Sequence, residues 1–289
     1  MKTFLECLPC MMQQALRAGR MSSNDDTTVK TILDEVGGMI KDIPMHSTPA
    51  ESGALVYQRI REITGVVDPY LKIKKESIEQ AKALYPELKH EVKKSKNPLL
   101  TAIRIAIAGN VIDFGMSKKF SLVEDVQRIL KQDFAILDFD EFQKQLKSAK
   151  NILYLGDNAG ESVFDKILIE ELGKPLTYVV REIPVINDVV YQDAVDSGLD
   201  ELAEIISSGT TAPGTILHLC TDEFNQRFNK ADMVISKGQG NYEGLSNVAR
   251  SVFFLLKAKC PVIARDIGVD EDDIVLQYKK ELPRFKKIK

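Results

Sequence analysis

The chain has 289 residues, 44% of them hydrophobic and 28% charged, which is an ordinary globular composition with room for an α/β domain and a smaller unit. Its 39 basic and 42 acidic residues leave a net charge of −3, which argues against a nucleic-acid surface as its main role. The sequence has no run of roughly 20 apolar residues that could span a membrane and no signal-peptide core. Its four Cys are too few for a disulfide framework in a chain of this length, which fits a reducing compartment. We therefore expect a cytoplasmic protein without membrane or nucleic-acid partners.

The first half of the chain is expected to be helical. Apolar residues recur there at three- and four-residue spacing in five stretches: 1–20, 25–42, 50–64, 70–85 and 97–116. Prolines, which start or stop helices, fall at the joints between them: Pro44, Pro49, Pro69, Pro86 and Pro98. A further helical pattern covers 121–133, and no strand pattern precedes residue 134. We therefore predict a helical N-terminal domain over residues 1–135.

The second half has short apolar runs that end in polar or Gly-rich turns and are followed by helical patterns. The predicted strands cover 151–155, 176–181, 203–206, 232–236, 260–264 and 274–278. Alternating strands and helices indicate a largely parallel sheet in a three-layer αβα core, here over residues 136–289. Ligands of such sheets bind outside the carboxyl ends of the strands, so the loops after the strands are the candidate site.

The first of these loops is GDNAGE, residues 156–161, directly after the strand NILYL. Asp157 and Asn158 offer a carboxylate and an amide oxygen, which are ligands of hard cations such as Mg²⁺ and Mn²⁺. Asp and Asn are equally common in plain turns and helix caps, so the hexamer alone does not decide between the two.

The second loop is REIPVIND, where Asn187 and Asp188 follow Pro184. Asp188 would complete a three-oxygen site with Asp157 and Asn158, leaving positions open for water and a phosphate. The alternative is that Asn187 and Asp188 cap the next helix. Arg181 would clamp an oxyanion, or pair with a surface carboxylate.

The third loop is SKGQGNYEG, residues 236–244, after the strand DMVIS. A lysine, Lys237, beside a Gly-rich turn before a helix is suited to hold phosphate through its charge and through backbone N–H groups. The alternative is a flexible turn with a solvated lysine. The candidate phosphate-binding residues here and in the weaker run SSGTTAPGT are Lys237, Gly238, Gly240, Asn241, Ser208 and Gly209.

Two other groups of residues leave alternatives open. The helix around RIAIAGNVIDFG carries Arg104, Asn110 and Asp113 in an apolar stretch, where they line the active site or attach the helical domain to the sheet. Cys7 and Cys10 form a single C-x-x-C. They bind metal together with the remaining cysteines, act as a redox pair, or are inert, and the incomplete ligand set favours an inert or structural role.

The motifs GDNAGE, Arg181 with Asn187–Asp188, and SKGQGNYE together resemble the damage-control phosphatase family (ARMT-like, formerly a domain of unknown function). The Cys7–Cys10 pair and RIAIAGNVID resemble its archaeal and bacterial branch. The resemblance covers nearly the whole chain. It implies a helical unit on an αβα core, a divalent metal (Mg²⁺, Mn²⁺, Co²⁺ or Ni²⁺) on Asp157, Asn158 and Asp188, and substrate phosphate on Lys237.

The resulting prediction is a metal-dependent phosphatase that hydrolyses phosphomonoesters of small metabolites, such as sugar phosphates or damaged cofactor precursors. Asp157 acts in this hypothesis as a metal ligand or as the nucleophile. Two alternatives remain, namely a carboxyl methyltransferase that uses S-adenosylmethionine and a non-catalytic protein that binds phosphorylated metabolites. Oligomeric state is not indicated.

Overall fold

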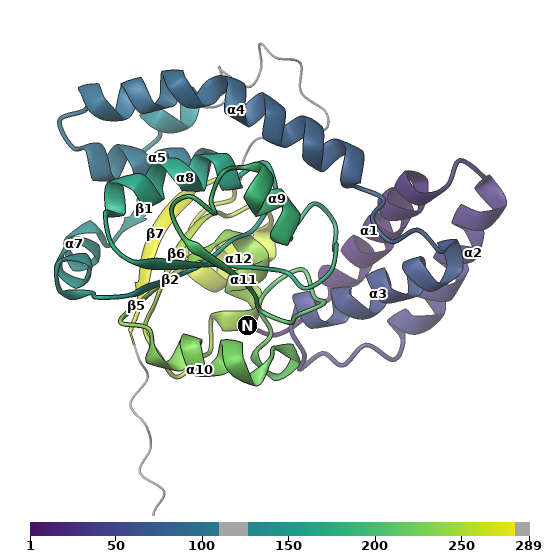
Figure 1. The fold of residues 1–289 in the computed structure, drawn as a ribbon. Helices are drawn as coiled ribbons and strands as arrows, with labels where there is room; N and C mark the ends of the chain where they lie inside the picture. Colours follow the sequence, from purple (N-terminus) through teal and green to yellow (C-terminus); the bar gives the residue numbers. More distant parts are fainter. Residues whose placement is uncertain (110–126, 281–289) are drawn as a thin grey trace, which may run out of the picture.

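The computed structural model describes residues 1–109 and 127–280 (Figure 1). The N-terminal part is helical, as predicted, with elements α1 (Cys7–Ser22), α2 (Asp26–Ile40), α3 (Pro49–Thr64), α4 (Leu71–Lys94) and α5 (Pro98–Gly109). Local sequence explains the clearest boundary, where the Thr48 side chain accepts a hydrogen bond from the backbone N–H of Glu51 and Pro49 occupies the first turn. Gly65, with φ of 67°, then ends α3.

The C-terminal part contains a seven-stranded sheet in the order β1-β7-β6-β5-β2-β3-β4. Its strands are β1 (Phe134–Leu137), β2 (Ile152–Leu155), β3 (Leu176–Val180), β4 (Glu204–Ser207), β5 (Met233–Lys237), β6 (Val252–Lys257) and β7 (Ile274–Lys279). All neighbours pair in parallel except β6 and β7, which are antiparallel. The predicted α/β class with a largely parallel sheet is confirmed.

Helices cover both faces of this sheet (Figure 1). They are α7 (Phe139–Ser148), α8 (Ser162–Leu172), α9 (Tyr191–Asp196), α10 (Asp222–Lys230), α11 (Gly238–Leu245) and α12 (Pro261–Ile267), with a short 3₁₀ turn at Leu217–Leu219. Successive strand residues point to opposite faces, so Tyr154 lies in the cluster beneath α5 and α8, whereas Leu153 and Leu155 lie in the cluster beneath α10, α11 and α12. The sheet is therefore the middle of three layers.

One predicted strand is wrong. Cys260 is the N-cap of α12 and residues 261–264 belong to this helix, because Pro261 stands at the first helical position, where its fixed φ favours a helix and its missing N–H is not needed. The strand of this region is instead β6, whose Val252–Leu256 are all buried, as expected for a strand covered on both faces.

A predicted helix end is also wrong. The stretch 70–85 was expected to stop at Pro86, but α4 continues through this proline to Lys94. Leu88 and Val92, beyond the proline, are buried in the main hydrophobic cluster, and this burial offsets the backbone hydrogen bond that Pro86 removes.

The N-terminal helices pack in two different ways. Helices α1, α2 and α3 share a hydrophobic cluster that includes Ala15, Ile32 and Val56 and also takes in Val185 of the loop after β3. Helices α4 and α5 instead contribute to the cluster of the sheet, where Ile103 of α5 packs with residues of α8 such as Phe164. The boundary at residue 135 remains a prediction. For the cavity described below, the relevant unit is the group α1–α3, which we call the cap.

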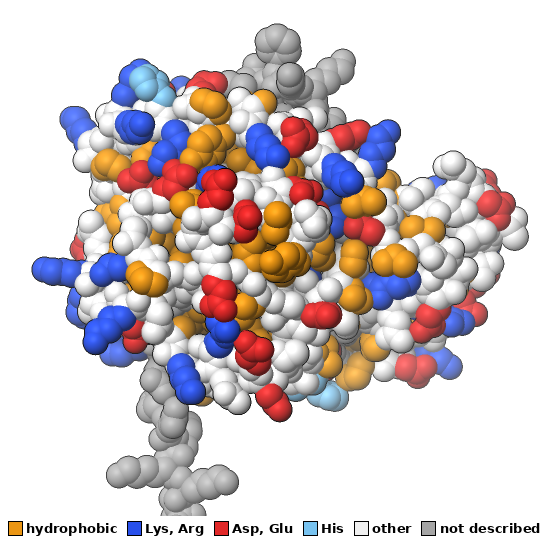
Figure 2. Space-filling model, in the orientation of Figure 1, with side chains coloured by type: hydrophobic (Ala, Val, Ile, Leu, Met, Phe, Trp, Pro, Cys, Tyr) orange, Lys and Arg blue, Asp and Glu red, His pale blue; other side chains and the backbone are white. Residues whose placement is uncertain are grey.

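On the face shown in Figure 2, basic and acidic side chains are interspersed, without a field of one sign. Over the described residues, no helix is both long and apolar enough to cross a lipid bilayer.

Candidate active site

The candidate site lies at the edge of the sheet where strands β5, β2 and β3 end. These three strands are adjacent and parallel, so the loops that follow them meet at one edge. The loop 156–161 follows β2, the loop 181–190 follows β3, and α11 follows β5 directly. The topology thereby brings together the three motifs that were singled out in the sequence.

Backbone hydrogen bonds join the first two loops. The N–H of Val189 donates to the carbonyl of Asp157 at 2.8 Å, and the N–H of Ala159 donates to the carbonyl of Asn187 at 2.8 Å. Asn158 and Asp188 form an isolated antiparallel bridge. The side chains of Asp157, Asn158 and Asp188 are therefore held next to one another by main-chain geometry.

Asp157 and Asp188 are almost fully buried, at 7% and 4% exposure. Burial, together with the nearby carboxylates of Glu161 and Asp188, raises the pKa of Asp157 to about 8. Burial likewise raises the pKa of Asp188, although the Arg181 guanidinium opposes this. The structure thus concentrates negative charge where water is largely excluded, an arrangement that is stable only when protons or a cation compensate the charge.

Arg181 supplies part of this compensation. Its Nε donates to Asp188 Oδ2 at 2.7 Å, and its Nη2 lies 3.9 Å from Asp157 Oδ1. The side chain is 1% exposed and does not line the cavity described below. The structure therefore places Arg181 behind the two carboxylates, on the side away from the cavity.

Lys237 is equally buried, with no exposed side-chain surface. Its Nζ lies 2.6 Å from Asp165 Oδ1 and 3.1 Å from Glu161 Oε2. Burial lowers its pKa, but the two carboxylates outweigh this effect and raise the pKa of Lys237 above the usual value. Two tyrosines complete the network, since Tyr154 and Tyr178 each donate a hydrogen bond to Asp165. Lys237 is held as a charged group among carboxylates and does not line the cavity.

The turn after Lys237 comes very close to Asp157. Gly238 has a φ of 76°, and a Cβ at this position would lie only 1.9 Å from Asp157 Oδ2, so glycine is required there for two reasons. Asn241 donates hydrogen bonds to the carbonyls of Gly156 and Lys237, at 3.0 and 2.8 Å. These contacts fix the start of α11 against the loop that carries Asp157.

The other predicted phosphate-binding residues lie apart. Ser208 is buried and donates a hydrogen bond to the carbonyl of Val180 at 3.1 Å. Gly209 packs against Thr221. Of the predicted phosphate-binding residues within the described part of the chain, Gly240 lines the cavity. Asn110 lies outside the described residues.

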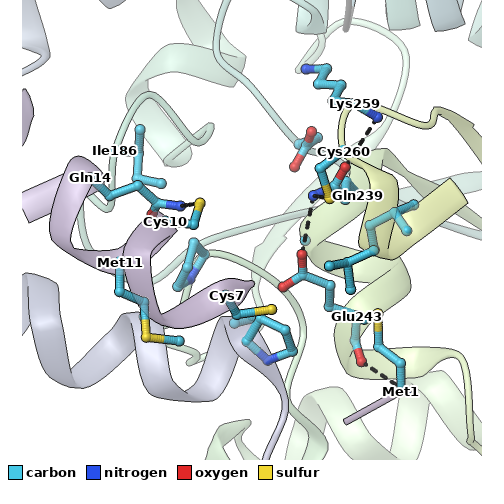
Figure 3. A pocket seen from close by; sticks show the side chains of 18 of the residues that line it. Met1, Cys7, Cys10, Met11, Gln14, Ile186, Gln239, Glu243, Lys259 and Cys260 are labelled. Atoms are coloured by element: carbon cyan, nitrogen blue, oxygen red, sulfur yellow. Dashed lines mark hydrogen bonds between the residues drawn. The ribbon is translucent and has the colours of Figure 1, made fainter. Parts of the chain in front are cut away.

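A cavity of about 590 Å³ opens in front of the acidic cluster. Asp157, Asn158 and Asp188 line it from the core. In Figure 3, Cys7, Cys10, Met11 and Gln14 of α1 face Gln239, Glu243, Lys259 and Cys260 of the core across an open space. The cavity therefore lies between the cap and the sheet domain.

Comparison with known proteins places the chain in a family. The model of the damage-control phosphatase ARMT1-like domain matches residues 3–275. A damage-control phosphatase of Pyrococcus horikoshii is 38% identical, over 97% of this chain and 99% of the relative. One of Archaeoglobus fulgidus is 33% identical, over 93% and 96%. This chain belongs to the damage-control phosphatase family. A crystal structure of a DUF89 family protein from P. horikoshii matches this phosphatase with a TM-score of 0.91 and 36% identity, over 97% of this chain and 100% of that one.

The structure of the phosphatase shows cavity residues that the sequence interpretation did not select. Lys259 is exposed, lines the cavity and interacts favourably with the charge of Asp157. Gln239 and Glu243 lie one turn apart on α11, and Gln239 donates to Glu243 at 3.3 Å. Lys259 follows β6, so correct placement of this strand would have identified it by the same rule as the other loops.

The structure places Arg104 and the Cys7–Cys10 pair in different surroundings. Arg104 stacks over the ring of Phe134, with 4.4 Å from its Cζ to the ring centroid, and donates to the carbonyl of Gln132. It attaches α5 to the start of the sheet and does not line the cavity. By contrast, Cys7 and Cys10 both line the cavity of the phosphatase.

Proposed function

We propose that this phosphatase hydrolyses phosphomonoesters of small metabolites with a divalent cation bound by Asp157, Asn158 and Asp188. The observation that carries the proposal is the pair of joined loops, which presents three oxygen-bearing side chains at one end of the cavity. The family is generally dependent on a divalent metal.

The donor set fits a hard cation. Among the described residues, no three His, Cys, Asp or Glu side chains are grouped to hold a metal, so the set depends on the amide of Asn158. The Nδ2 of Asn158 donates to Asp157 and Glu161, which turns its amide oxygen away from them. Oxygen donors of this kind suit Mg²⁺ and Mn²⁺, with Co²⁺ and Ni²⁺ as further candidates. When bound, such an ion polarises a phosphoryl oxygen and offsets developing charge.

Side chains of the protein itself would position the substrate and orient the carboxyl groups of the site. Lys259 offers an exposed ammonium beside Asp157, where it can hold a phosphoryl oxygen as the bridging ester bond breaks. Arg181 orients Asp188 through its 2.7 Å hydrogen bond and opposes the rise in the pKa of this carboxyl group. Lys237 orients Glu161 and Asp165 through its contacts at 3.1 and 2.6 Å, as a positioning residue behind the site. The cap and α11 form the other walls of the cavity.

The test combines metal binding with turnover. The purified protein is stripped of metal and titrated with Mg²⁺, Mn²⁺, Co²⁺ and Ni²⁺ by calorimetry, and phosphate release is then measured from p-nitrophenyl phosphate and a panel of sugar phosphates. We expect one strong binding site and metal-restored release, both lost in Asp157→Asn and Asp188→Asn. Asp200→Asn, which removes an exposed carboxylate, is the matched control. Metal binding that survives both site variants would refute the assignment.

A further inference from the structure

Three of the four cysteines line the cavity of the candidate active site. Cys7 and Cys10 lie on α1 of the cap, and Cys260 lies on the core at the start of α12 (Figure 3). All four cysteines are free thiols. The fourth, Cys220, is outside this cavity, where its Sγ donates to the carbonyl of Ile216 at 3.2 Å.

The sequence Cys7-Leu8-Pro9-Cys10 forms the first turn of α1. Side chains three positions apart on a helix lie on one face, with Cβ atoms roughly 5–6 Å apart, and a disulfide needs Cβ atoms about 3.5–4.5 Å apart. The pair stands at the end of the helix, where the N–H groups of Cys7 and Leu8 bond the carbonyls of Phe4 and Leu5 outside α1 and no preceding helical turn constrains them. Pro9 has no N–H and stiffens the backbone between the two thiols.

The two thiols of this turn have different environments. Cys10 is exposed, and its Sγ accepts a hydrogen bond from Gln14 Nε2 at 3.3 Å. Cys7 is half-buried, and burial raises the pKa of its thiol. Because the thiolate is the nucleophile and must be accessible, Cys10 is the group that an oxidant reaches, and Cys7 is placed to react with the product.

The alternative of a thiol-ligated metal is not favoured. Within residues 1–109 and 127–280, no three His, Cys, Asp or Glu side chains form a group that could hold a metal ion. Cys260 comes from the core, whereas Cys7 and Cys10 share one helical turn. The pair on α1 is thus the one that local geometry prepares for a bond.

We propose that Cys10 and Cys7 are a peroxide-sensitive pair whose disulfide alters the cap wall of the cavity and weakens substrate binding. The Cys10 thiolate attacks a peroxide, forming an S–O bond as the O–O bond breaks, and gives a sulfenic acid with release of hydroxide. The Cys7 thiolate then attacks the Cys10 sulfur, the S–S bond forms and hydroxide leaves as water after protonation. The regulatory part of this proposal rests on the proposed phosphatase site.

The expected effect on the site follows from the packing of Cys7. Its side chain contacts both the cluster of the cap and the cluster on the core that includes Met1 and Val262. Drawing its Sγ toward Cys10 removes this thiol from the junction between cap and core, which is the wall of the cavity. The side chains proposed to bind the cation lie on the core, so substrate affinity should change more than the rate of the chemical step.

The experiment uses the full chain. Reduced protein is treated with hydrogen peroxide and the excess is removed. Free thiols are counted, the disulfide is mapped by peptide mass spectrometry, and KM and kcat for p-nitrophenyl phosphate are measured before and after dithiothreitol. We expect two of the four thiols to be lost, a Cys7–Cys10 link, and a several-fold rise in KM that dithiothreitol reverses. Cys10→Ser and Cys7→Ser should keep their KM after peroxide, whereas Cys220→Ser should respond as the parent does.

Each other outcome is decisive. A link to Cys260, or an unchanged thiol count, would overturn the assignment of the pair. A Cys7–Cys10 link with unchanged KM would overturn the regulatory role alone. If the reduced protein binds metal but releases no phosphate, the proposed function fails and the regulatory role fails with it, while the thiol count and the mapped link still decide whether the oxidation site exists.

Discussion

The two walls of the cavity are built differently. The core wall carries Asp157 and Asp188 on loops that are joined by backbone hydrogen bonds and packed against buried cations. The cap wall comes from α1 and α3, whose hydrophobic cluster meets the core through Val185 of the loop after β3. Side chains on the core wall are therefore fixed to the sheet, whereas those on the cap wall depend on how the cap packs against the core.

The two walls suit two different tasks, namely binding of a metal and selection of a substrate. A metal centre needs ligands held within a fraction of an ångström, which joined loops on a rigid sheet supply. Substrate selection needs a surface that can vary without disturbing that centre, and a wall on separate helices supplies it. Substitutions on the core wall should therefore have larger effects than substitutions near the cap.

The largest effect is expected for Asp157→Asn. The variant keeps the shape but loses a charged oxygen ligand, so kcat/KM should fall about 10³-fold. Without metal, the same change removes one of several buried carboxylates that repel one another, so the metal-free variant should melt no earlier than the parent. Phosphate release and thermal denaturation in EDTA measure the two effects. Activity within about tenfold of the parent would remove Asp157 from the centre.

Lys237→Met tests the buried side of the core wall. It leaves Glu161 and Asp165 without the cation that lies 3.1 and 2.6 Å from them, and breaking such a buried pair costs about 3–5 kcal/mol of unfolding free energy. Urea unfolding measures this loss of unfolding free energy. The control is Lys257→Met, which removes a pair with the exposed Asp272 and should change stability by less than about 1 kcal/mol. A fully stable Lys237→Met with a raised KM would instead show direct phosphate binding.

Lys259→Ala tests the other lysine of this wall. Because Lys259 is exposed and lines the cavity, loss of a charge-assisted contact to phosphate should raise KM roughly 10–100-fold and leave stability within about 0.5 kcal/mol. The exposed Lys230→Ala serves as control. An unchanged KM would place the phosphate elsewhere in the cavity.

The comparison between Lys237 and Lys259 also shows what the sequence could predict. The rule that ligands bind beyond parallel strand ends located the loops of Asp157 and Asp188 correctly at one edge, because strand patterns are local. Whether a lysine faces the cavity depends on partners far away in the chain. Lys237 meets Glu161 and Asp165, which lie 76 and 72 positions away, and no local pattern reveals that pairing.

The cap wall was less predictable for the same reason. Cys7 and Cys10 were recognisable as a pair, but their place in the cavity depends on how the cap packs against the sheet domain, which periodicity does not encode. Lys259 was missed for a different reason, since the apolar run of β6 was overlooked and the strand was assigned to 260–264. The helix-start signal at Pro261 would have excluded a strand at 260–264, so this error lay in the interpretation of a local pattern and not in tertiary structure.

The smallest predicted effect concerns Glu243, where α11 meets the cap. Burial raises the pKa of Glu243 to about 7, opposed by Gln239, the amino group of Met1 and the backbone of Ala50. A carboxyl with a raised folded pKa is easier to bury while it is protonated, so its ionisation lowers stability as the pH rises from about 4.5 through about 7. Cys7 and Cys260 also face this group, but burial raises their pKa values and they stay protonated over that range.

Glu243→Gln removes this ionisation and keeps the shape of the side chain. The variant should match the parent at pH 5 and exceed it by about 1–2 kcal/mol at pH 8, after allowance for partial solvent exposure, which denaturant unfolding at the two pH values can measure. Glu223→Gln, on the exposed face of α10, should show no such pH-dependent gain. An equal gain at both pH values would mean that Glu243 does not titrate in this range. The contact between α11 and the cap would then make no pH-dependent contribution to stability in this range.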